Sequence, residues 1–160
     1  KRVNIHSFLE VGSQMGCISQ MYGHLPGHGM LTRKDLNVKM VNYYAEFYQD
    51  KKHCFNNEMY FPYSYRLNSK KECTQFFEEL HTDKYKQRRE TEPVTFVIKK
   101  GYGAHRARGL AIMDVEKEKE LVDYYQDGKL CGEIKESTVA QYYISNPLLL
   151  DKQNKFDFRM

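Results

Sequence analysis

Cationic side chains and glycines gather between two short apolar stretches in the second half of the chain. Residues 94–113 read VTFVIKKGYGAHRARGLAIM, and the alternating apolar flanks predict a strand, a loop and a second strand. Gly101 and Gly103 give the loop backbone freedom to bend. A hairpin of this kind can hold a polyphosphate, because charges and backbone N–H groups can both face it. The cations concerned are Lys99, Lys100, His105, Arg106 and Arg108.

Other kinds of site find less support in the sequence. The P-loop pattern GxxxxGK[ST] is absent, and a GxGxxG reading that starts at Gly101 fails because position 106 is Arg. His24 and His28 are separated by a Pro-Gly pair, so their spacing lacks metal-binding geometry, and we expect ordinary turn histidines. Basic and aromatic residues alternate in places, but no RRM, KH or OB pattern accompanies them, and we do not expect nucleic-acid binding.

The composition is that of a globular protein. The chain has 160 residues, 41% hydrophobic and 29% charged, which suits one domain or two small lobes. The net charge is only +4, but cations cluster at residues 84–89 and 99–108, which favours an acidic partner. No stretch approaches 18 apolar residues, so we expect no membrane span and a cytoplasmic location.

The cysteines and the chain ends carry two further expectations. Cys17, Cys54, Cys73 and Cys131 are far apart with no CxxC pair, which argues against zinc and predicts free thiols in a reducing compartment. The chain begins without Met and stops at KFDFRM within an apparent strand, so we expect a piece of a larger protein.

Helices and strands follow one another in an α+β order. A helix is predicted from an N-cap at Thr32 to about Gln49, then a strand over residues 59–67. Ser69 and Glu72 form a capping-box pattern for a second helix, which extends through residue 85. Residues 87–93 read as a linker, with a lobe boundary near Glu90. Beyond the hairpin, a helix is predicted at 116–125 and strands at 130–134, 138–144 and 155–159.

Six segments, in register and in order, resemble the tubulin tyrosine ligase-like family of ATP-grasp enzymes, which join an amino acid to tubulin tails. They are RKDL (33–36), YFPYSYRL (60–67), FVIKK (96–100), RGLAI (108–112), QYYISNPLLL (141–150) and KFDFR (155–159). The resemblance covers about residues 21–160. It implies an N-terminal lobe over residues 1–90 and a central ATP-grasp lobe over 91–160, with antiparallel strands and flanking helices, truncated before a C-terminal lobe.

The resemblance also assigns roles to individual residues. The cofactor-binding set that it implies, for the triphosphate, the phosphate-covering loop and the adenine linker, is Lys34, Lys99, Arg108, Gln141, Tyr143, Ile144 and Lys155. Asp157 and Arg159 are the implied catalytic residues. Lys155, Asp157 and Arg159 alternate along one strand, so their side chains are predicted to share a face. The sequence departs from the family at Lys100, where proline is usual, and at Tyr142, where Lys or Arg is usual.

The implied activity uses ATP and Mg²⁺, whose acidic ligands the family carries beyond the position of Met160. An acceptor carboxylate would be activated as an acylphosphate and attacked by the amine of glycine or glutamate, with cations around the transferred phosphoryl group. The basic patches would attract glutamate-rich tubulin tails, in a cilium or another microtubule array. This chain alone would be inactive. The altered phosphate loop favours one alternative, a non-catalytic component that binds microtubules.

Overall fold

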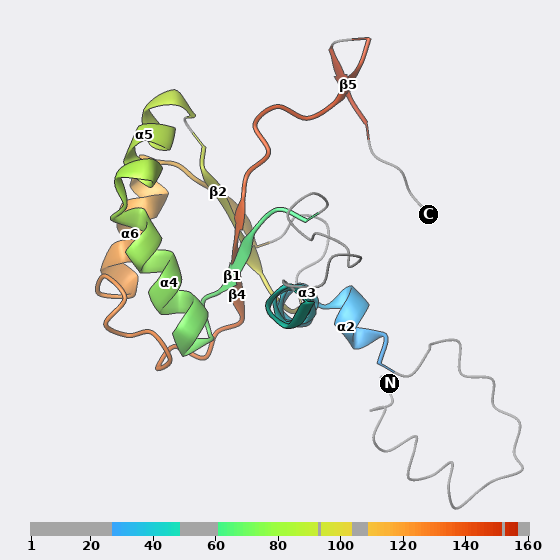
Figure 1. Ribbon diagram of the computed structural model, residues 1–160. Coiled ribbons are helices and arrows are strands. Elements are labelled where there is room, and N and C mark those ends of the chain that lie inside the picture. The colour runs from blue at the N-terminus through green and yellow to red at the C-terminus, as the bar shows by residue number, and fades with distance from the viewer. Residues whose placement is uncertain (1–26, 49–60, 93, 104–108, 152, 157–160) are drawn as a thin grey trace, which may run out of the picture.

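The molecule is built on one antiparallel sheet with helices on both faces (Figure 1). The structure is a computed structural model that describes residues 27–48, 61–92, 94–103, 109–151 and 153–156. The four strands lie in the order β1-β4-β2-β3, and each neighbouring pair is antiparallel. Their bounds are β1 (Ser64–Arg66), β2 (Phe96–Lys100), β3 (Leu110–Met113) and β4 (Thr138–Tyr142). The predicted hairpin around residue 103 and the strand at 138–144 are therefore confirmed.

Three helices cover one face of the sheet: α4 (Lys70–Leu80), α5 (Asp83–Thr91) and α6 (Val115–Tyr124). Because side chains alternate along a strand, Phe96 and Ile98 both point to this face. Phe96 is fully buried, packs edge-on against Phe76 of α4 and stacks on Tyr142. The core beneath the helices combines these aromatic rings with aliphatic and sulfur-containing side chains, including Leu67, Phe77, Leu80, Met113, Leu121 and Ala140.

The other face is covered in part by α3 (Lys34–Tyr48), which follows the single turn α2 (Gly29–Thr32). The helix is found where the sequence predicted it, but its predicted cap is wrong. Thr32 is the last residue of α2, and its hydroxyl donates to the carbonyl of His28. Val38 of α3 is buried, whereas Met40 and Tyr43 are exposed.

The second predicted helix is divided in two. Ser69 precedes α4, but Glu72 does not complete a capping box, because its carboxylate accepts from the backbone N–H and the guanidinium of Arg66. The helical pattern is interrupted at Thr82. Its side chain accepts from the N–H of Tyr85 and so caps the N-terminus of a separate helix, α5. Residues 87–91, predicted as linker, are thus helical.

Two later predictions have opposite outcomes. The helix predicted at 116–125 is confirmed as α6, and Asp114 caps it by accepting from the N–H of Lys117. The strand predicted at 130–134 is wrong, because residues 130–133 form turns in which Gly132 has a φ of 91°. A small hairpin, β5 (Leu149–Leu150) with β6 (Asn154–Lys155), projects from the sheet (Figure 1).

The architecture confirms the α+β prediction of antiparallel strands with flanking helices. Residues on both sides of position 90 contribute to one core: Tyr65 and Phe76 come before it, and Phe96 and Ala140 after it. β1 also pairs directly with β4. The division into an N-terminal lobe over 1–90 and a central lobe over 91–160 stays a prediction. None of the helices in the described ranges has the length and apolarity to cross a membrane.

A disulfide joins Cys73 of α4 to Cys131 in the turns after α6. The prediction of free thiols is therefore wrong for these two residues, which the fold brings together although 58 positions separate them in the sequence. Both side chains are buried in the core. Cys17 and Cys54 lie outside the described residues.

Reduction of this disulfide should lower the free energy of unfolding, because the bond restricts the unfolded chain across a separation of 58 residues. The chain-entropy relation gives about 4 kcal/mol for such a loop. Urea unfolding with and without reductant measures the difference. In the Cys73→Ala/Cys131→Ala double variant, which serves as the control, reductant should not move the midpoint. Identical wild-type midpoints in both conditions would contradict the bond.

Candidate phosphate-binding site

Two lysines lie near each other where α3 begins and β2 ends. Lys99 points to the sheet face opposite α4, and Lys34 is the first residue of α3. The backbone N–H of Lys34 donates to the carbonyl of Gly101 at 3.1 Å, which ties the start of the helix to the end of the strand. Burial lowers the pKa of Lys99 below its ordinary value, and the positive charge of Lys34 lowers it further. Repulsion between the two positive charges reduces the stability of the folded protein, whereas the same two charges favour the binding of an anion.

Gln141 completes a polar row on the same face. The Lys99 ammonium donates to its Oε1 at 2.5 Å, and its Nε2 donates to the hydroxyl of Ser64 at 2.9 Å. The Ser64 hydroxyl in turn donates to the carbonyl of Pro62. These bonds fix which end of the Gln141 amide faces the lysine. The structure therefore brings together three of the residues predicted from the sequence: Lys34, Lys99 and Gln141.

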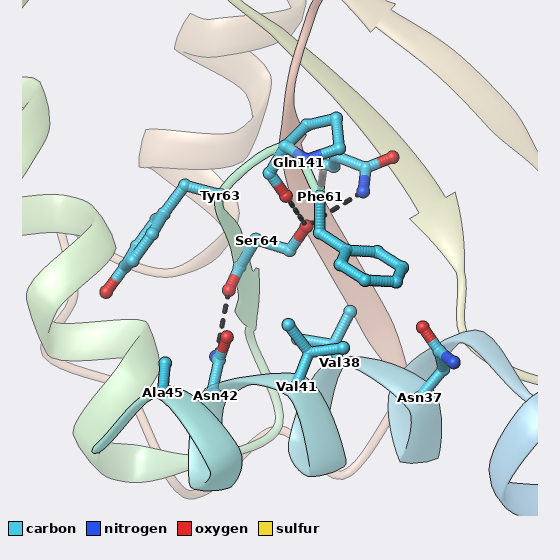
Figure 2. Close-up of a pocket in the computed structure, with 10 residues that line it drawn as sticks. Asn37, Val38, Val41, Asn42, Ala45, Phe61, Tyr63, Ser64 and Gln141 are labelled. Carbon is cyan, nitrogen blue, oxygen red and sulfur yellow. Dashed lines mark hydrogen bonds between the residues drawn. The ribbon is translucent and has the colours of Figure 1, made fainter. Parts of the chain in front are cut away.

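A small hollow adjoins Gln141 between α3 and the segment that enters β1 (Figure 2). Val38 and Val41 form its apolar side, and the ring of Phe61 lies across from them. On the polar side, Asn42 donates to the backbone carbonyl of Ser64 at 3.1 Å. The residues around the hollow thus hold α3 against β1 through both apolar contacts and a hydrogen bond. Because Lys34 is the first residue of α3, these contacts also help to position Lys34.

A buried carboxylate holds Lys34 in place. Asp35, only 5% exposed, accepts two hydrogen bonds from Arg33, at 3.1 and 2.6 Å, and one from the Ser137 hydroxyl at 2.8 Å. Burial alone would raise the pKa of Asp35, but these hydrogen bonds and the charge of Arg33 outweigh burial, and the pKa is lowered. In the sequence Asp35 stood out only as part of the RKDL segment, and nothing in the sequence pointed to Ser137.

Gly101 is required by close packing against this carboxylate. A Cβ placed there would lie 2.1 Å from the Ser137 hydroxyl oxygen and 2.8 Å from the Asp35 Cβ. Its N–H also donates to the carbonyl of Ser137 at 2.7 Å. The sequence had suggested freedom to bend as the reason for glycine, whereas the structure shows that a larger residue does not fit.

The loop between β2 and β3 is anchored at both ends. The guanidinium of Arg33 lies 4.8 Å from the ring centre of Tyr102, and the N–H of Lys100 donates to the carbonyl of Gly109. Lys100 alternates to the face opposite Lys99 and forms an ion pair with Glu136 at 3.5 Å. It therefore does not extend the lysine pair. Residues 104–108, including His105, Arg106 and Arg108, lie outside the described residues.

The resemblance assigned Tyr143 and Ile144, in the segment after β4, to an adenine linker. The N–H of Tyr143 donates to the carbonyl of Thr95 at 2.9 Å, and its own carbonyl accepts from Arg88 at 3.3 Å. Ile144 is 57% exposed. The guanidinium of Arg88 lies 4.4 Å from the ring centre of Tyr142, the position where the resemblance implied a lysine or an arginine.

The remaining predicted residues are not joined to this site by the structure. Lys155 is exposed and lies in the β5–β6 hairpin, which projects from the sheet (Figure 1). Asp157 and Arg159 lie outside the described residues, so the predicted common face of Lys155, Asp157 and Arg159 stays a prediction. Within the described ranges, no three acidic, histidine or cysteine side chains cluster as metal ligands would.

The model of the family described as "Tubulin-tyrosine ligase family" matches residues 12–160. The match spans the sheet and all the described helices, together with the two lysines and Gln141.

Replacing Lys34 by Gln should raise the pKa of Lys99, because the nearby positive charge that disfavours its protonated form is removed. NMR titration with ¹³C-labelled lysine measures this pKa directly. Lys39→Gln, at an exposed position of the same helix, is the matched control and should leave the pKa of Lys99 unchanged. If both variants gave the wild-type pKa, the two lysines would not interact.

Proposed function

Because the chain belongs to the tubulin-tyrosine ligase family, we propose that it is part of an ATP-dependent ligase that adds glycine or glutamate to tubulin tails. Members of this family are ATP-dependent amino acid ligases, and tubulin is their general substrate. The observation that carries the proposal for this chain is the pair of Lys34 and Lys99 beside Gln141. The choice between glycine and glutamate, and a location in cilia or axonemes, are part of the proposal.

The lysine pair suits a polyphosphate on physical grounds. In the ligand-free protein, Lys99 loses solvation and lies near a second cation, so its protonated form is disfavoured. An anion that contacts the Lys99 ammonium near Lys34 would reverse both effects, because it attracts each charge and replaces lost water contacts. Phosphoryl transfer needs cations around the transferred group, and here they stand on two rigid elements, a strand and a helix.

The other proposed roles extend from this pair. We assign Gln141, Tyr143 and Ile144 to the nucleotide linker, and Arg108 to the loop over the phosphates. Lys155 is proposed to face the nucleotide, and Asp157 and Arg159 to act at the acceptor. ATP would supply the phosphoryl group that activates a carboxylate, with Mg²⁺ as its counterion, and the described residues hold no cluster that we assign to the metal.

Fewer cations are available to attract acidic tubulin tails than the sequence suggested, because two of the arginines in the 84–89 cluster form ion pairs within the protein. Arg88 forms an ion pair with Glu92, and Arg89 with Glu118, at 3.0 and 2.8 Å. These carboxylates neutralise both arginines at short range, so their contribution to a long-range field is small. Charge reversal at Arg88 or Arg89 would therefore disturb the fold as well as any tail binding, and it is a poor test of that binding.

The first test uses the full-length protein with tubulin, ATP, Mg²⁺ and radiolabelled glycine or glutamate. Wild type should transfer one of the two, and Lys99→Ala should lower the rate by at least about 100-fold, because a cation at the transferred phosphoryl group is removed. Lys39→Ala, an exposed lysine on α3, should retain wild-type activity.

The contrary result distinguishes the alternative function. If neither amino acid is incorporated while the wild type and Lys99→Ala bind microtubules equally well, the protein is a non-catalytic microtubule-binding component. Equal incorporation by the wild type and Lys99→Ala would retain the ligase activity but remove the lysine pair from its mechanism.

A further inference from the structure

Arg88 joins helix α5 to the segment that follows β4. Its Nε and Nη2 atoms donate to one oxygen of Glu92 at 3.1 and 3.0 Å, and Nη2 also donates to the backbone carbonyl of Tyr143 at 3.3 Å. The guanidinium carbon lies over the ring of Tyr142, 4.4 Å from its centre. The side chain is thus held by an ion pair, a ring and a main-chain acceptor at once.

The surface on which Arg88 rests is rigid. The ring of Tyr142 stacks on Phe96, with centroids 4.6 Å apart and an interplanar angle of 18°. Phe96 is fully buried beneath α4 and α5. Closely packed interiors resist displacement, so the Tyr142 ring, which stacks on the buried Phe96, gives the partly exposed Arg88 a well-anchored surface to pack against.

The contact with Tyr143 fixes the orientation of one peptide group. The described chain has no cis peptide bond, so the N–H of Ile144 points opposite to the carbonyl of Tyr143 and away from Arg88. The N–H of Tyr143 is itself bonded to Thr95. Among the described residues, none accepts a hydrogen bond from the N–H of Ile144, whose side chain is exposed.

We propose that Arg88 is a positioning residue for nucleobase selection: by holding the Tyr143 carbonyl, it presents the Ile144 N–H as a fixed donor to the base. This inference rests on the proposed function, which places a nucleotide along this segment. A fixed donor suits adenine, whose N1 is an acceptor, and opposes guanine, whose N1 carries a hydrogen. Without Arg88 the peptide is freer to rotate, and the distinction between the two bases weakens.

The test measures dissociation constants of ATP and GTP by calorimetry on the full-length protein. Wild type should favour ATP. Arg88→Met keeps the length of the side chain but removes its charge and donors. It should weaken ATP binding about tenfold and GTP binding much less, because a charge-assisted hydrogen bond is removed from a partly buried site. The ratio of the ATP and GTP dissociation constants reports on the orientation of the Tyr143–Ile144 peptide, whereas a general loss of protein stability would not change this ratio.

Arg89→Met is the matched control, since it makes the same substitution one residue away, in a side chain that contacts Glu118 instead. It should leave both constants at their wild-type values. Arg88→Lys retains the charge with a poorer fit to ring and carbonyl, so it should lose part of the selectivity. This variant decides the question if Arg88→Met does not fold, which its thermal melting curve would show.

Two results would overturn the inference, and they are distinguishable. If wild type binds ATP selectively and the Arg88 variants keep that selectivity, or lose affinity for both nucleotides in equal proportion, Arg88 does not set the base preference. If wild type binds neither nucleotide, the proposed function fails together with this inference.

Discussion

The arrangement of the site depends on one buried carboxylate. Asp35 is accessible to solvent over only 5% of its surface, and its oxygens accept from Arg33 on its own segment and from Ser137 beside β4. Because a buried carboxylate is stable only when its lone pairs are satisfied, Arg33 and Ser137 are held as firmly as Asp35 itself. Gly101 closes the arrangement by packing against both acid and serine. The backbone N–H of Lys34 donates to the carbonyl of Gly101, so the start of α3 is held at the end of β2, near Lys99.

This constraint explains how the folded chain tolerates two lysines near each other. Lys99 has a lowered pKa because burial and the charge of Lys34 both oppose its protonated form. The unfolded chain holds that proton more tightly, so stability increases as the pH rises toward 10.5, the ordinary value for lysine. At neutral pH the penalty is present in full and must be offset by contacts elsewhere. A site that reduces stability in the absence of ligand is typical of a binding function.

Local patterns predicted the elements, and contacts distant in sequence decided the site. Alternation in residues 94–113 gave the hairpin, because strand periodicity is a property of neighbouring residues. The same reasoning missed the break at Thr82, where one side-chain hydrogen bond divides an otherwise continuous helical pattern. The bond between Asp35 and Ser137 spans 102 positions, and the disulfide spans 58, so neither leaves a local signal. The pairing of Lys34 with Lys99 was suggested only by resemblance.

β4 connects the two halves of the proposed nucleotide site. Ser137, just before the strand, bonds to Asp35 and so supports the lysine pair, while Tyr143, just after it, is held by Arg88. Val139 lies opposite Lys99 in the register, four residues before Tyr143. At the rise of a β-strand, these four residues span about 13 Å of backbone. The same strand therefore carries both the support of the lysine pair and the segment held by Arg88, so the two parts of the proposed site belong to one element of the sheet.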